Sequence, residues 1–196
     1  MAKLFISYAR RDGKELANRL AANLEYDHDP WLDTSKIPGG PDWSLVIERA
    51  IDQCEVLLVL LTTGSYNSSI CRGEQLRGLR KDKLVIPLLA EAGADRPVYL
   101  EAANYVDFTN TDAYEESLRA LRSSIETGEG VRLQELPTRI QEKVAAEERR
   151  QQMAALVGGR YATWSEVCSL AKAQQQRYLE GLAGRRSGAA IFDSAL

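Results

Sequence analysis

The chain has 196 residues, 44% of them hydrophobic, which fits one globular domain or one domain with a small appendage. Its net charge of −3 comes from interspersed acids and bases, so a broad nucleic-acid surface, which needs a clear basic excess, is not expected. The longest apolar run, Val56–Leu61, is far shorter than the roughly 20 residues of a membrane-spanning helix, so no membrane span is expected either.

Apolar runs alternate with segments of helical periodicity up to about residue 126. The run at Glu55–Leu61 does not alternate with polar residues, which predicts a strand buried on both faces, as at the centre of a parallel sheet. In chain order, the predicted elements are a strand at Lys3–Tyr8, a helix marked by Leu16 to Leu24, a strand at Pro30–Leu32, a helix at Trp43–Gln53, the strand at Glu55–Leu61, a helix within Tyr66–Leu79, a strand at Leu84–Leu89, a strand at Tyr105–Phe108 and a helix at Tyr114–Ile125.

This alternation predicts βαβ units and a doubly wound α/β fold with a parallel sheet. Right-handed crossovers place the functional loops of such a sheet at the carboxyl ends of its strands. Those loops are the polar turn ARRDG, the Pro- and Gly-rich loop Thr34–Asp42 and the turn Thr62–Ser65. Any chemistry is therefore expected where these three loops meet.

The alternation of predicted strands and helices stops at about residue 127, so we predict a main domain over 1–127 and a helical extension over 128–196. The extension contains a charged, alanine-rich helix at Thr138–Leu156 and a second helix after the capping-box pattern Thr163-Trp-Ser-Glu166, followed by a loose tail. Two helices alone bury little surface, so they are expected to dock on the main domain, to pair with another chain, which includes assembly, or to continue into a further region. The expected contact face of the second helix consists of Val167, Leu170, Tyr178 and Leu182.

Cysteine and histidine usage excludes several kinds of site. Cys54, Cys71 and Cys168 are an odd number without CxxC spacing, so neither a disulfide framework nor a metal site is indicated, and a reducing cytoplasm is the simplest location. The N-terminal residues show no apolar core of a secretory signal. His28 is the single histidine and lies in EYDHDP, which predicts a solvated loop. Cys71, with no histidine near it in sequence, is expected to be a small buried hydrophobe and not a nucleophile.

Three segments together resemble the Toll/interleukin-1 receptor (TIR) domain family, bacterial type. The resemblance covers about residues 2–126, and each segment falls at the end of a predicted strand. The segments are Phe5-Ile-Ser-Tyr8 with Arg10, Arg11 and Asp12, the glycine-bearing stretch from Leu32-Asp33 to Trp43 (the family's BB loop), and Ser65-Tyr-Asn-Ser-Ser-Ile-Cys-Arg-Gly-Glu74, which is similar to the family's S-x-Y-x-x-S-x-W-C-x-x-E.

The resemblance implies a flavodoxin-like, five-stranded parallel sheet in the order 2-1-3-4-5. It also implies one of two functions: signalling through self-association with like domains, or hydrolysis and cyclisation of NAD⁺, often in bacterial anti-phage immunity. NAD⁺ would then be the substrate, and no cofactor is expected. Glu74 matches the catalytic position of the family.

A single carboxylate is chemically sufficient for cleavage of NAD⁺. Ordinary glycosidases need two, one of which protonates the leaving oxygen. The nicotinamide of NAD⁺ is already a cation and departs as a neutral molecule, so no acid is required. One carboxylate beside the ribose can stabilise the positive charge that develops on the sugar. Against this stands the simpler interpretation of Glu74 as a solvated helix residue.

Arg10 and Arg11 follow the first strand, where a doubly wound fold binds ligands, and either guanidinium could hold the pyrophosphate of a dinucleotide. The resemblance favours Arg10, although arginines in turns are commonly solvated. Tyr8 is expected either to support the first loop or to pack in the core.

The remaining candidates for substrate binding lie in the BB loop and before Glu74. Gly39 and Gly40 would let the BB loop adopt backbone conformations that are closed to other residues. The loop is expected to cover the substrate, to dock on a neighbouring subunit or to be a plain surface turn. Ser35 stands where some active members of the family have an acidic residue. Trp43 is expected either to pack in the core or to stack on a ring of the ligand. Ile70 stands where the family usually has a tryptophan that stacks on nicotinamide.

The loss of that tryptophan favours an alternative: a catalytically silent module that recruits partners through the BB loop. A response-regulator receiver needs an aspartate at the end of the third strand, where this chain has Leu61-Thr62-Thr63. A flavodoxin needs a Ser/Thr-rich phosphate loop in place of ARRDG. Neither of these two classes is supported.

Overall fold

In the computed structural model, the described residues are 1–32, 43–101 and 103–156. The chain divides into two compact units, Met1–Glu148 and Arg149–Leu196. The fold described below is that of the first unit. The BB-loop candidates Ser35 and Gly39, and the predicted second helix with Val167, Leu170, Tyr178 and Leu182, lie outside the described residues.

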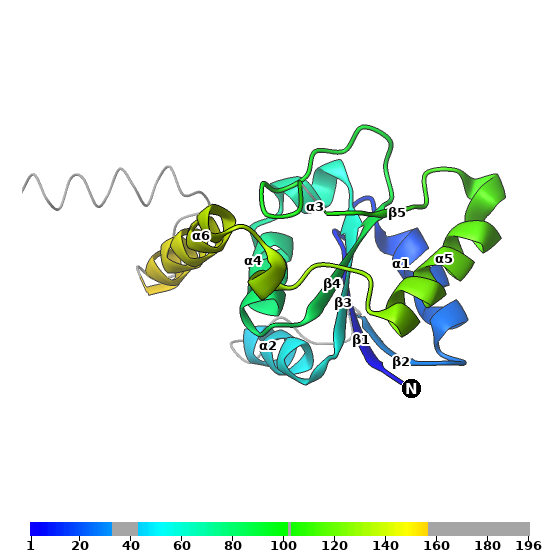
Figure 1. The fold of residues 1–196 in the computed structure, drawn as a ribbon, viewed down its shortest axis with the longest axis horizontal. Helices are drawn as coiled ribbons and strands as arrows, with labels where there is room; N and C mark the ends of the chain where they lie inside the picture. Colours follow the sequence, from blue (N-terminus) through cyan, green and yellow to red (C-terminus); the bar gives the residue numbers. More distant parts are fainter. Residues whose placement is uncertain (33–42, 102, 157–196) are drawn as a thin grey trace, which may run out of the picture. The chain divides into compact units, whose positions relative to one another are not determined.

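Five parallel strands form one sheet in the order β2-β1-β3-β4-β5 (Figure 1), which confirms the predicted fold and strand order. The strands are β1 (Lys3–Ser7), β2 (Asp29–Leu32), β3 (Val56–Leu61), β4 (Leu84–Leu89) and β5 (Val106–Asp107). All six residues of β3 are buried, as its uninterrupted apolar sequence predicts for the central strand.

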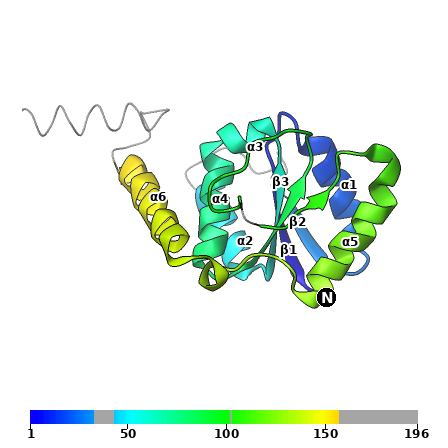
Figure 2. The same cartoon turned by 45° about the horizontal axis from the view of Figure 1, so that its top comes forward.

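Helices cover both faces of this sheet, α1 (Lys14–Leu24) and α5 (Tyr114–Thr127) on one and α2 (Trp43–Gln53) and α4 (Ser69–Arg80) on the other (Figure 2). Alternate β3 side chains therefore enter different cores. Leu58 and Leu60 pack with residues of α1 and α5. Leu57, Val59 and Leu61 pack with residues of α2 and α4.

The helix predicted within Tyr66–Leu79 is two helices in the structure, α3 (Thr63–Asn67) and α4. Thr62 caps α3, because its side chain accepts a hydrogen bond from the Ser65 backbone N–H at 3.0 Å. Ser68 then takes an extended conformation and caps α4 through Cys71 N–H. The run of hydroxyl residues thus supplies two helix starts where a single helix with a preceding turn was predicted.

His28 is buried, with 8% of its surface exposed, and the prediction of a solvated histidine is wrong. It lies between α1 and β2, and its Nδ1 faces the backbone N–H of Ala2 at 3.4 Å. Because it precedes β2, it lies at the amino ends of the strands. His28 is therefore a packing residue remote from the carboxyl ends, where parallel sheets bind ligands.

The segment after α5 continues along the sheet. Gly128 ends α5 in the left-handed conformation, and Val131 then exchanges two backbone hydrogen bonds with Val85 of β4, at 2.8 and 2.9 Å. A 3₁₀ turn, η2 (Leu133–Glu135), leads to α6 (Thr138–Leu156), and Leu136 and Val144 are buried in the core of α2 and α4. A domain boundary at residue 127 stays a prediction.

Among the helices of the described residues, none combines the length and the apolar character required to cross a membrane.

Candidate functional site

The carboxyl end of β1 forms the floor of the candidate site. Ser7, the last residue of β1, is buried, and the chain turns sharply after it. The turn is closed by Gly13 N–H, which donates to the Ala9 carbonyl at 2.8 Å. Arg10 and Arg11 lie within this turn and are exposed at the edge of the sheet.

Glu74 of α4 reaches the same edge. Its side chain is buried, with 7% of the residue exposed, and Ser7 Oγ donates a hydrogen bond of 2.6 Å to Glu74 Oε2. A bond of this length is typical of a hydroxyl donating to a charged carboxylate. The interpretation of Glu74 as a solvated helix residue is therefore wrong, and its carboxylate is held in a fixed orientation.

A cavity of about 450 Å³ brings the predicted residues together. Its lining includes five residues predicted from the sequence: Tyr8, Arg10, Arg11, Ile70 and Glu74. The arginines give the cavity a cationic wall, whereas Glu74 places a carboxylate inside it. Such a cavity suits a ligand with an anionic end and a centre that becomes cationic during reaction.

Tyr8 and Ile70 contribute apolar surface to this cavity. Tyr8 is partly buried, packs against the core of α1 and α5 and also lines the cavity. Ile70 is 50% exposed. A half-exposed isoleucine offers contact to a flat ring without the stacking geometry of tryptophan.

A larger cavity, of about 770 Å³, lies along β5 and α5 and contains none of these residues. Its charged lining, Asp107, Glu116, Glu129 and Glu135, is acidic, so it does not suit a phosphate-bearing ligand. The combination of two arginines with one carboxylate, and not volume, identifies the smaller cavity as the candidate site.

The side chains of three predicted residues are not described by the structure. Ser35 and Gly39 lie outside the described residues, and Trp43 begins α2 with a side chain that is not described. Their roles stay predictions.

Sequence reasoning missed Ser7, Asn67 and Ser68, which belong to the site or its lining. Ser7 had a recognisable signal, because a polar residue that ends an apolar parallel strand lies at the carboxyl edge of the sheet. Asn67 and Ser68 lie within the motif that ends at Glu74, but their place in the cavity depends on the break between α3 and α4, which the motif does not predict.

Cys71 lines the cavity, and burial, followed by the nearby charge of Glu74, raises the pKa of its thiol from 9.0 to about 11. The thiolate is the reactive form, so Cys71 is expected to alkylate about a hundredfold more slowly near pH 8 than the same cysteine in the unfolded chain. Iodoacetamide labelling followed by peptide mass spectrometry measures this, and the rate should climb as the pH approaches 11. Equal rates in folded and unfolded protein would contradict the assignment of Cys71 as a buried hydrophobe.

No group of three histidine, cysteine, aspartate or glutamate side chains is arranged to hold a metal ion within residues 1–32, 43–101 and 103–156.

Comparison with known proteins agrees with this architecture. The TIR domain of the Toll-related receptor TRR-2 from Hydra magnipapillata superposes with a TM-score of 0.55 at 22% identity, covering 64% of this chain and 99% of that domain. Weaker likenesses are to CMP N-glycosidase BcmB of Clostridium botulinum (TM-score 0.48, 17% identity, 61% and 97% covered) and to TIR domains of the activated Roq1 resistosome (0.42, 13%, 88% and 99%).

No curated protein sequence matches the chain. A family model described as a TIR domain matches residues 4–122, a span that contains the five strands except for the first residue of β1, together with the lining of the Glu74 cavity. The chain therefore belongs to the TIR domain family.

Proposed function

We propose that this TIR domain cleaves the bond between nicotinamide and ribose in NAD⁺, as a hydrolase or cyclase, with Glu74 as the catalytic residue. The observation that carries the proposal is a buried carboxylate, oriented by Ser7, in the same cavity as two arginines. In this proposal NAD⁺ is consumed as a substrate.

The reaction needs little from the protein beyond charge placement. The C–N bond breaks with both electrons passing to the nicotinamide ring, which leaves as a neutral molecule. The Glu74 carboxylate stabilises the ribosyl cation that remains. Attack by water, which then releases a proton, gives linear ADP-ribose, whereas attack by a nucleophile of the same dinucleotide gives a cyclic product.

The other residues of the cavity bind substrate in this proposal. Arg10 and Arg11 hold the pyrophosphate through charge-assisted hydrogen bonds. Tyr8 forms a wall beside the first loop, and Ile70 contacts the nicotinamide ring at the mouth.

Replacing Ser7 by alanine is expected to lower kcat by about tenfold to a hundredfold, since a hydrogen bond to a charged group contributes about 1.5–3 kcal/mol. The structural reason is that the Glu74 carboxylate loses the donor that sets its orientation. Steady-state kinetics of nicotinamide release measures the effect. Ser7→Thr, which keeps the hydroxyl, is the matched control and should retain more activity than Ser7→Ala; identical kcat values for wild type and Ser7→Ala would show that this bond has no part in catalysis.

We place this activity in an assembled, cytoplasmic protein of a bacterial anti-phage response. Self-association would run through the TIR domains, and the helices after residue 127 would bind a further protein partner or a second copy. This setting rests on the family resemblance. The dependence of nicotinamide release on protein concentration tests the assembly.

Ile70 favours the alternative of a catalytically silent docking module, because a half-exposed isoleucine replaces the usual tryptophan at the mouth of the cavity. Incubation of the purified protein with NAD⁺ over a range of protein concentrations, with and without a crowding agent, separates the two functions. The enzyme is expected to release nicotinamide at a specific rate that rises with protein concentration. Absence of nicotinamide under every condition would leave the docking module.

A further inference from the structure

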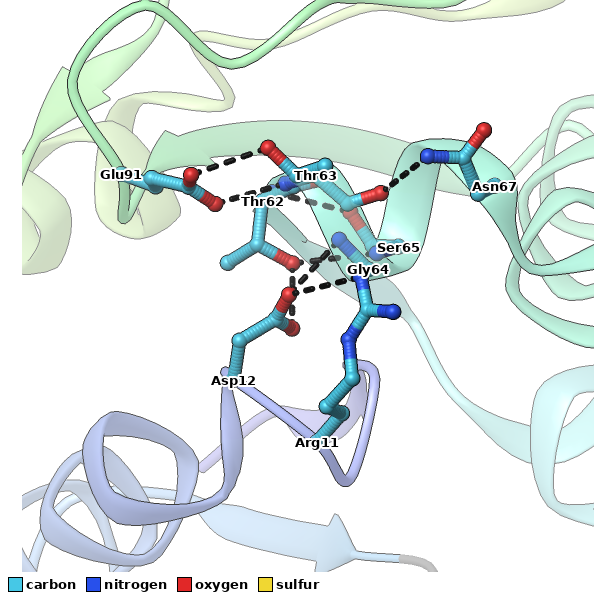
Figure 3. A network of polar contacts seen from close by, with 8 residues as sticks. All are labelled: Arg11, Asp12, Thr62, Thr63, Gly64, Ser65, Asn67 and Glu91. Carbon is cyan, nitrogen blue, oxygen red and sulfur yellow. Dashed lines mark hydrogen bonds and ion pairs between the residues drawn. The ribbon is translucent and has the colours of Figure 1, made fainter.

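Asp12 joins the arginine-bearing turn to the start of α3 (Figure 3). Its Oδ1 accepts a hydrogen bond from Thr62 Oγ1 at 2.7 Å, and its Oδ2 accepts one from the Gly64 backbone N–H at 2.7 Å. Thr62 and Gly64 lie about fifty positions along the chain from Asp12. The two bonds are therefore tertiary contacts that fix one loop of the cavity to another.

The same carboxylate also lies beside Arg11. Arg11 Nη2 is 3.6 Å from Asp12 Oδ2, and the side chain of Asp12 is only 26% exposed. Within the turn, Asp12 N–H and Gly13 N–H both donate to the Ala9 carbonyl. Displacement of Asp12 would therefore displace the short turn that carries Arg10 and Arg11.

Gly64 shows how closely Asp12 approaches α3. A Cβ atom built on Gly64 would lie 2.3 Å from Asp12 Oδ2 and 2.4 Å from Oδ1, inside any real contact distance. Gly64 is helical, and alanine is the better helix former, so local backbone preference does not explain a glycine here. The glycine instead leaves room for the carboxylate of Asp12.

The far side of α3 is fixed as well. Glu91, which follows β4, accepts hydrogen bonds from Thr63 N–H at 2.7 Å and from Thr63 Oγ1 at 2.9 Å (Figure 3). Two acids from different strand ends thus hold the first turn of α3. Asp12 consequently ties the exposed turn to a helix that Glu91 already holds from the other side.

We propose that Asp12, accommodated by Gly64, is a positioning residue that holds Arg10 and Arg11 for the pyrophosphate of the substrate. This inference rests on the proposed cleavage of NAD⁺. Asp12 acts on binding of the anionic part of the dinucleotide, whereas Ser7 and Glu74 act on the bond that breaks. Loss of Asp12 therefore raises KM and leaves kcat nearly unchanged.

Kinetics of three variants test this separation. Asp12→Ala and Gly64→Ala are each expected to raise the KM for NAD⁺ about tenfold with kcat within about twofold of wild type. Asp12→Asn, which keeps one acceptor, should fall between Asp12→Ala and wild type. The double variant Asp12→Ala/Gly64→Ala should have the same KM as Asp12→Ala alone, because both substitutions act through one contact. Glu15→Ala, an exposed acid just after the turn, is the control and should match wild type.

A second pair of measurements does not depend on catalysis. In a Glu74→Gln background, Asp12→Ala should weaken binding of ADP-ribose about tenfold by calorimetry, and it should speed hydrogen exchange at the Gly64 amide. If the Glu74→Gln background gave these results but the wild-type protein released no nicotinamide from NAD⁺, the proposed cleavage would be overturned, whereas the role of Asp12 in holding the arginine-bearing turn would stand. Unchanged ADP-ribose affinity, no ADP-ribose binding at all, or a fall in kcat with unchanged KM would each overturn the role of Asp12.

Discussion

Glu74→Gln is expected to lower the rate of nicotinamide release by about a hundredfold or more without unfolding the protein. Glutamine has the shape of glutamate, and its amide oxygen can still accept the hydrogen bond of Ser7. What disappears is the negative charge that stabilises the ribosyl cation. Chromatographic measurement of nicotinamide gives the rate, and thermal unfolding of the variant reports whether its fold is intact.

The control for this substitution is Glu126→Gln, an exposed acid near the end of α5. The same chemical change there should leave nicotinamide release at the wild-type rate, because the residue lies outside the cavity. If Glu74→Gln and Glu126→Gln released nicotinamide equally fast, Glu74 would have no catalytic role.

Gly130→Ala is expected to lower the free energy of unfolding by about 1–3 kcal/mol. A Cβ atom at Gly130 would lie 2.7 Å from the Val85 carbonyl oxygen and 2.8 Å from Leu84 Cδ1. The backbone at Val85 cannot move away without breaking its pairing in β4, so the segment of Gly130 must shift. That shift strains the bridge between Val131 and Val85 and loosens the packing of Leu136.

Urea denaturation measures this loss as a lower midpoint. Glu129→Ala, an exposed substitution next to Gly130, should change stability by no more than about 0.5 kcal/mol. A midpoint for Gly130→Ala equal to that of wild type would mean that the segment after α5 contributes little to the fold of Met1–Glu148.

The sheet could be predicted because its signals are local. Glu55–Leu61 reads as a central strand by its lack of alternation, and Leu84–Leu89 was predicted with the bounds that the structure has. Tyr105–Phe108 was predicted too long, as β5 contains only Val106–Asp107. An edge strand pairs on one side only, so its length depends on tertiary contacts that the sequence does not display.

The errors arise where tertiary contacts override local pattern. His28 stands among acidic residues in sequence, yet the turn into β2 buries it. The break between α3 and α4 depends on Ser68 leaving the helical conformation to cap the next helix. Neither the burial nor the break follows from periodicity or charge.

The candidate site was predicted as a set of residues and not as an arrangement. The family motif pointed to Glu74, and the topology pointed to the turn of Arg10 and Arg11. The bond from Ser7 to Glu74 spans 67 positions, and that from Asp12 to Gly64 spans 52. Contacts between such distant residues exist only once the parallel strands are aligned, so they had to come from the structure.

A crystal structure of the Glu74→Gln variant with NAD⁺ bound would test the central claim most directly. The anomeric carbon bearing nicotinamide is expected to lie about 3.5 Å from the side chain of residue 74, with the pyrophosphate on the guanidinium groups of Arg10 and Arg11. NAD⁺ bound elsewhere on the domain, with residue 74 out of reach of the ribose, would contradict it.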